Sequence, residues 1–67
     1  MEIKLNGAAH RLNSASLAEL LIEQAIDTSK RGIAVAINDA IVPRAEWAST
    51  PLKGGDVVEI VRPHSGG

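Results

Sequence analysis

The dipeptide Asn6-Gly7, placed between two short stretches of alternating apolar and polar residues, is the feature that most constrains the fold of this chain. A two-residue type I′ turn needs positive φ at both central positions, and asparagine and glycine tolerate this well. Ile3 and Leu5 alternate with polar neighbours, as they would in a half-buried strand. The chain is therefore predicted to begin with a β-hairpin whose strands cover residues 2–6 and 8–12.

A helix is predicted to follow the hairpin and to begin near Leu17. Ser16 stands three residues before Glu19, which is the capping-box spacing, in which each side chain accepts a hydrogen bond from a free backbone amide. The pattern fades over residues 27–32, so basic residues are expected near the C-terminal end of this helix and a glycine after it. The predicted apolar stripe, with a period of about 3.6 residues, consists of Leu17, Leu20, Leu21 and Ala25.

Three further strands are predicted in the rest of the chain. The apolar run 33–38 suits a central strand, 41–42 a short strand that Pro43 limits, and 57–62 the last strand. Residues 44–51 are expected to be irregular, apart from one helical turn that carries Trp47 inward.

This order of elements predicts an α+β fold of the β-grasp, ubiquitin-like type. Two hairpin-like halves around one helix favour a mixed sheet of four to five strands, with the helix packed on one face. The helical connection is expected to let strand 33–38 run parallel to the first strand or its neighbours. We expect a β-grasp domain over residues 1–62 and a flexible C-terminal tail over residues 63–67 that ends in Gly66-Gly67.

The composition narrows the functions open to this domain. The chain has no cysteine, and His10 and His64 lack neighbours at ligand spacing, so no metal site is expected. Seven basic and eight acidic residues are dispersed, which argues against nucleic acid or a membrane as partner. No run is apolar enough to cross a bilayer, and a cytoplasmic location is expected. No acid-base or nucleophilic constellation can be assembled, so we expect a protein that is not itself an enzyme.

The tail is the segment expected to carry the chemistry. Without a Cβ at Gly66 or Gly67, it is thin enough to enter a narrow active site, where it presents the α-carboxylate of Gly67. That carboxylate repels nucleophiles at neutral pH, so it must be activated before it reacts.

A docking surface is predicted on the side of the sheet away from the helix, which we call the open face. Period-two alternation leaves this side unusually apolar, and exposed apolar patches often mark interaction sites. The alternative is that loops or the second copy in a homodimer cover this face. Pro63, His64 and Ser65 are also predicted to contact partners, and Arg44 to be a surface ion-pair partner or a docking charge. The predicted open face consists of Ala34, Ala36, Val57, Glu59 and Val61.

Five strings in the chain together resemble the ThiS family of sulfur carriers in thiamine thiazole biosynthesis. The strings are LNG at 5–7, SLAELL at 16–21, AVAIN at 34–38, IVPR at 41–44 and LKGGDVVEIV at 52–61, followed by the diglycine. Small subunits of molybdopterin synthase share the fold and the diglycine, but they usually run longer and lack the IVPR string. A ubiquitin-like protein modifier and a structural β-grasp interaction module remain alternatives.

The resemblance implies a sequence of partners that act on Gly67. An E1-like, ThiF-like adenylyltransferase would use ATP to adenylate its carboxylate. Sulfur from a source such as a cysteine desulfurase would then give a thiocarboxylate, and a ThiG-like thiazole synthase would receive that sulfur. The chain itself would bind no cofactor.

Overall fold

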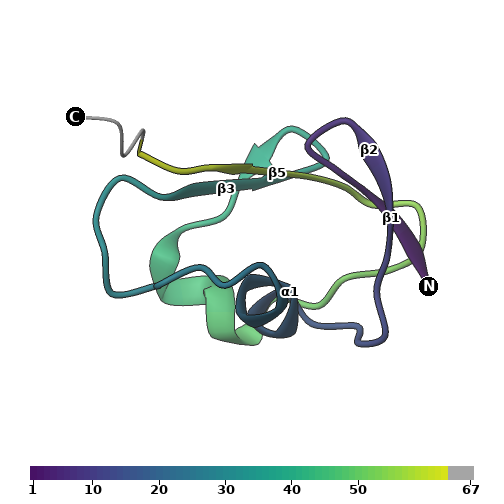
Figure 1. Ribbon diagram of the computed structural model, residues 1–67, viewed down its shortest axis with the longest axis horizontal. Coiled ribbons are helices and arrows are strands. Elements are labelled where there is room, and N and C mark those ends of the chain that lie inside the picture. Colours follow the sequence, from purple (N-terminus) through teal and green to yellow (C-terminus); the bar gives the residue numbers. More distant parts are fainter. Residues whose placement is uncertain (64–67) are drawn as a thin grey trace.

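In residues 1–63, which the computed structural model describes, five strands form one layer and the helices form a second layer below it (Figure 1). The strand order in the sheet is β2-β1-β5-β3-β4. This arrangement confirms the predicted β-grasp fold. The elements are β1 (Glu2–Leu5), β2 (Ala8–Arg11), α1 (Leu17–Glu23), β3 (Ala34–Ile37), β4 (Ala40–Ile41), the 3-10 helix η1 (Arg44–Ser49) and β5 (Val57–Val61).

The parallel pair of the sheet is formed by the first and the last strand. β5 lies parallel to β1 and antiparallel to β3, while β1–β2 and β3–β4 are antiparallel hairpins. β3 thus runs parallel to β2, a neighbour of β1, as predicted, but it is antiparallel to β1 itself and to β5, the strand with which it pairs. β1 and β3 are not neighbours in the sheet. β5, the last strand in the sequence, lies between them.

Both hairpins turn through residues with positive φ. Asn6 and Gly7 have φ of 50° and 86°, which confirms the first predicted turn. Asn38 and Asp39, with φ of 51° and 69°, form the turn between β3 and β4. Asparagine and aspartate are the residues other than glycine that most often adopt this conformation.

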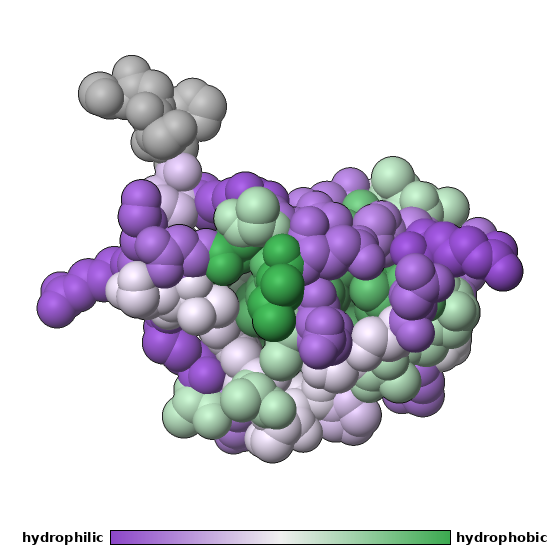
Figure 2. Space-filling view, turned by 60° about the horizontal axis from the view of Figure 1, so that its bottom comes forward, coloured by the Kyte–Doolittle hydropathy of each residue, from purple (hydrophilic) through white to green (hydrophobic). Residues whose placement is uncertain are grey.

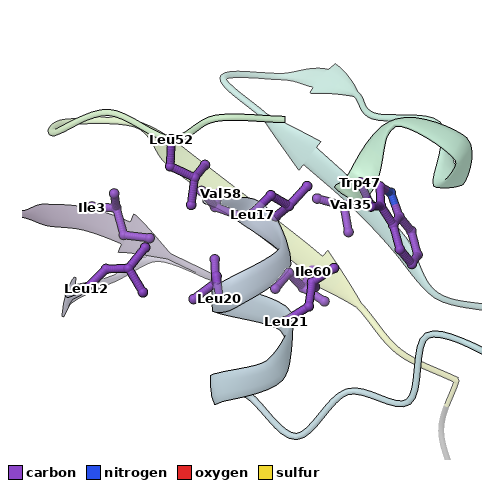
Figure 3. Packing of buried hydrophobic residues seen from close by; sticks show 10 residues of the cluster. All are labelled: Ile3, Leu12, Leu17, Leu20, Leu21, Val35, Trp47, Leu52, Val58 and Ile60. Atoms are coloured by element: carbon purple, nitrogen blue, oxygen red, sulfur yellow. The ribbon is translucent and has the colours of Figure 1, made fainter. Parts of the chain in front are cut away.

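The core lies between the sheet and the two helices (Figure 3). Ser16 caps α1 as predicted, since its Oγ accepts a hydrogen bond from the Glu19 amide at 3.3 Å. η1 carries Trp47 inward, where the indole Nε1 donates to the Val42 carbonyl at 2.8 Å. The buried apolar residues are Ile3, Leu12, Leu17, Leu20, Leu21, Val35, Trp47, Leu52, Val58 and Ile60.

Helix α1 ends at Glu23, earlier than the apolar stripe predicts. Ala25 is exposed, has φ of 57° and donates its amide to the Ile22 carbonyl, while the Ile26 amide donates to the Leu21 carbonyl. These are the two hydrogen bonds of a Schellman motif with alanine where glycine is usual. Ile26 packs against the core instead of Ala25, and the last turn of α1 contains no basic residue.

Asp56 is a buried carboxylate immediately before β5, with 3% of its surface exposed. Its Oδ2 accepts from the Lys53 amide at 2.9 Å and its Oδ1 from Asn38 Nδ2 at 3.0 Å. The Lys53 ammonium lies 3.3 Å from Oδ1. Burial raises the pKa of Asp56, but the hydrogen bonds and the lysine charge together lower it below its ordinary value.

Ala25→Gly is expected to raise the free energy of unfolding by about 1 kcal/mol, because glycine adopts positive φ without the steric strain that alanine has there. Urea denaturation of the two proteins measures this difference. Ala18→Gly, the same change inside α1, is the matched control and should lower the free energy of unfolding by about 1 kcal/mol. A lower or equal midpoint for Ala25→Gly would contradict the assignment of the Schellman motif.

Asp56→Asn is expected to flatten the dependence of stability on acid pH. Since the pKa of Asp56 is lower in the folded than in the unfolded chain, its contribution is complete above the unfolded value of about 4 and is lost as pH falls through the folded value. Urea unfolding at a series of pH values from about 6 to 2 should show a smaller loss of stability for the variant than for the parent chain. Parallel curves for the two proteins would count against this role.

Candidate functional site

The structure describes the predicted site up to Pro63. Gly66 and Gly67, predicted to carry the chemistry, lie outside the described residues, and so do His64 and Ser65. What can be described is the open face of the sheet and the base of the tail, where β5 ends.

The open face is formed by alternate residues of β3 and β5. The register pairs Ala34 with Val61 and Ala36 with Glu59, so these side chains share one side of the sheet. Val57 lies on the same side because it stands two residues before Glu59 on β5, and it pairs with Lys4 on β1. Ala36 is half-buried and the other four predicted residues are exposed, with exposed fractions of 61% for Val61 and 40% for Val57.

Ile41 belongs to the same surface, although it is not among the residues predicted for it. It pairs with Ala36 across the two-residue hairpin, and 71% of its surface is exposed. The signal was present in the sequence, because a two-residue turn at Asn38-Asp39 fixes the register of the strands around it. We include Ile41 in the open face from here on. A hollow in this face is lined by Asn6, Ala34, Val35, Ala36, Ile41, Glu59 and Val61.

The same side of the sheet becomes charged toward β1 and β2. Glu2 pairs with Arg11 and Lys4 with Ala9, in register with Val57 on β5. One half of this side is thus apolar except for Glu59, and the other half carries charges of both signs.

The base of the tail contacts the loop between α1 and β3, which lies at the end of the molecule where β5 stops (Figure 1). Arg62 Nη2 donates to the carbonyl of Gln24, the residue that caps the C-terminal end of α1, at 3.1 Å. Gly32, with φ of 87°, packs so closely on Pro63 that a Cβ added to it would lie 3.3 Å from Pro63 Cβ and Cγ. Arg62 and Pro63, the first two residues after β5, are therefore both in contact with this loop.

Arg44 interacts with backbone carbonyls and an aromatic ring. Its guanidinium donates to the Thr28 carbonyl and, at 2.6 Å, to the Lys30 carbonyl, and it lies 4.5 Å from the centroid of the Trp47 ring. Among the described residues it has no carboxylate partner, so the ion-pair expectation is not met there. Its role as a docking charge stays a prediction.

A second apolar surface lies on the helix side of the molecule, where Figure 2 shows hydrophobic side chains gathered among hydrophilic ones. Ile22 on α1 is 71% exposed beside a groove between α1 and η1. The predicted helical stripe gave no sign of it, since Ile22 stands outside that stripe. The groove is lined by Ala18, Leu21, Ile22, Ile26, Thr28, Arg44, Trp47 and Ala48.

The residues that the structure describes provide neither a metal site nor a membrane-spanning helix. Residues 1–63 contain no cluster of three or more histidine, cysteine, aspartate or glutamate side chains able to hold a metal ion. Over the same residues, neither helix has the length and apolar character that crossing a membrane requires.

Comparison with known proteins gives a consistent set of relatives. The sulfur carrier protein ThiS of Escherichia coli is 34% identical over 67 residues, which cover the whole of both chains. The sulfur carrier protein ThiS of Thermus thermophilus is 36% identical over 63 residues, 94% of this chain and 95% of that protein.

Solved structures agree with the fold described above. The crystal structure of a thiamine biosynthesis protein, ThiS, from Geobacter metallireducens superposes with a TM-score of 0.79 at 26% identity and covers all of both chains. The solution structure of a thiamine biosynthesis protein from that organism has a TM-score of 0.80, also at 26% identity, over all of this chain and 88% of the other.

The sequence model of the ThiS family matches residues 3–67, a range that includes the diglycine. Since this match spans almost the entire chain and the two relatives exceed 30% identity over nearly their full length, the chain belongs to the ThiS family.

Proposed function

We propose that this chain is a cytoplasmic sulfur carrier in thiamine biosynthesis and that the α-carboxylate of Gly67 carries the sulfur. The observation that carries the proposal is the ThiS family match, which runs through Gly66-Gly67 and agrees with two relatives named sulfur carrier proteins. The match also favours the thiamine pathway over the role of a molybdopterin synthase small subunit.

The proposed reaction begins at the Gly67 carboxylate in the active site of a ThiF-like adenylyltransferase. A carboxylate oxygen attacks the α-phosphorus of ATP, pyrophosphate leaves, and an acyl-adenylate forms. A sulfur nucleophile at the oxidation level of sulfide, derived from a source such as a cysteine desulfurase, then attacks the acyl carbon, and AMP leaves. The resulting thiocarboxylate has the nucleophilic sulfur that the carboxylate lacks, and a ThiG-like thiazole synthase would receive it.

The described residues support this role because they provide an exposed apolar face beside the strand from which the tail continues. Five residues from Pro63 to Gly67 can span at most about 17 Å, which is enough to reach into an active site while the domain stays outside. Three of the large apolar residues with the greatest exposure, Ile41, Val57 and Val61, lie on the open face. We propose this face as the surface on which the adenylyltransferase and the thiazole synthase dock.

Gly67→Ala is expected to slow adenylation by about tenfold or more, because a methyl group beside the acyl carbon restricts φ and blocks close approach to the reacting atoms. ATP–pyrophosphate exchange with the ThiF-like enzyme of the same organism measures this step. Gly54→Ala is the matched control, since a Cβ there would meet nothing within 4 Å and it lies in the turn before β5. Equal rates for Gly67→Ala and the parent chain would overturn the role given to Gly67.

The mass of the intact protein shows whether the C-terminal carboxylate has been converted into a thiocarboxylate. Protein purified from cells that make thiamine should contain a species heavier by about 16 Da, the difference between sulfur and oxygen, and deletion of Gly66-Gly67 should remove it. Conjugates with lysine in place of the thiocarboxylate would decide for a ubiquitin-like modifier.

Ile41→Asp and Val61→Asp are expected to weaken binding to the adenylyltransferase by about tenfold or more, because a carboxylate would have to be buried among apolar groups. Ile22→Asp is the control, since Ile22 and Ile41 are both 71% exposed but lie on opposite sides of the molecule. Isothermal titration calorimetry gives the dissociation constants, and circular dichroism verifies that each variant is folded. If only Ile22→Asp weakened binding, docking would occur on the helix side and the open-face proposal would be wrong.

A further inference from the structure

We propose that residues 24–33, between α1 and β3, act as a bracket that fixes the direction in which the chain leaves β5. This inference rests on the proposed function, because the exit direction matters for catalysis only if Gly67 has to enter a partner's active site. We call residues 24–33 the bracket loop.

The closest contact of the bracket loop is between Gly32 and Pro63. A Cβ at Gly32 would meet Pro63 Cβ and Cγ at 3.3 Å and Cδ at 3.5 Å, so the proline ring packs directly on the glycine backbone. The positive φ of Gly32 adds a second reason for glycine at this position. Proline has a fixed φ of its own, so a ring held in place also sets the orientation of the following peptide.

The second contact is made by Arg62. Its guanidinium donates to the carbonyl of Gln24, one of the carbonyls that α1 leaves without a helical partner. A cation is favoured at this end of a helix by the helix dipole. Two successive residues of the chain, Arg62 and Pro63, are therefore held at opposite ends of the same loop.

The bracket loop is itself held by the rest of the domain. The Arg44 guanidinium spans the Thr28 and Lys30 carbonyls and stacks on Trp47, whose ring is anchored in the core. Within the loop, Asp27 Oδ1 accepts from the Ser29 hydroxyl at 2.6 Å and from the Ser29 amide at 3.0 Å. Both hydrogen bonds favour the ionised carboxylate and keep the pKa of Asp27 below its ordinary value.

A small error at the base of the tail becomes larger at its end. A change of about 10° in exit direction moves the end of an extended segment of about 17 Å by about 3 Å. A misplacement of about 1 Å in an active site can reduce the rate by about 10²-fold. Rotations within the tail can correct part of such an error, so the expected effect of loosening the bracket is smaller than this limit.

The test compares Gly32→Ala with Gly55→Ala. Gly32 and Gly55 have φ of 87° and 88°, so alanine is strained equally in both, but a Cβ at Gly55 would meet nothing within 4 Å. In ATP–pyrophosphate exchange with the ThiF-like enzyme, Gly32→Ala should lower kcat by about threefold to tenfold with KM unchanged, because docking is intact and only the reacting group is misplaced. Gly55→Ala should retain the kcat of the parent chain.

A measurement without a partner tests the bracket independently of the proposed function. The backbone order parameter of the Arg62 amide, from ¹⁵N relaxation, should fall in Gly32→Ala and stay at the parent value in Gly55→Ala. If Gly32→Ala does not fold, Pro63→Gly removes the same contact from the other side and should lower both the order parameter and kcat.

The outcomes separate the two proposals. A parent chain that supports no exchange and carries no thiocarboxylate would overturn the proposed function, whatever the order parameters show. A parent chain that is active, with Gly32→Ala and Gly55→Ala equal in kcat, would overturn the bracket alone. An unchanged order parameter at Arg62 in Gly32→Ala would also overturn it.

Discussion

The hydrogen bonds of β5 join the two hairpins of this chain into one sheet, and the rest of the structure depends on them. β5 lies between β1 and β3, and its parallel register with β1 is short, since it pairs only Lys4 with Val57 and Leu5 with Val58. Side chains of the two hairpin turns add hydrogen bonds to β5 from both of its neighbours. Asn6 Oδ1 accepts from the Ile60 amide at 2.8 Å, and Asn38 Oδ1 accepts from the Val57 amide at 2.9 Å. Each asparagine thus forms part of its own turn and also accepts a hydrogen bond from β5, the strand that joins the two hairpins.

This double attachment fixes the register on which both faces of the sheet depend. A shift of β5 by one residue would turn Val58 and Ile60 toward solvent and bury Glu59 without a partner. The same register places Val57 and Val61 on the open face and directs Arg62 and Pro63 to the bracket loop. The core, the open face and the base of the tail are consequently three results of one strand alignment.

The sequence predicted features that carry a recognisable local signal, and it missed features without one, whether local or between distant residues. Asn6-Gly7, the Ser16 cap and the alternation along 57–61 act over a few positions, and the structure confirms all three. The early end of α1 was missed because Ala25 gives no glycine signal for a residue with positive φ. The contacts of Arg44 and Gly32 were also missed, since each joins segments at least 14 positions apart and leaves no periodic trace. For the diglycine, the chemical prediction stays untested by the described residues.

The distribution of apolar surface bears on how a carrier could serve two enzymes. A standard interface takes about 800 Å² from each partner, and that is a large share of the 4520 Å² that this chain exposes. If both the adenylyltransferase and the thiazole synthase must receive the same tail, each has to contact the end of the molecule where β5 stops. The open face adjoins that end through Val61, paired with Ala34, whereas Ile22 lies on the helix side. Two enzymes that dock beside the same short tail would exclude one another, so the carrier would have to dissociate between activation and delivery. A small apolar half-face bordered by charges suits that requirement, because apolar burial gives moderate affinity while charges steer encounter and orientation.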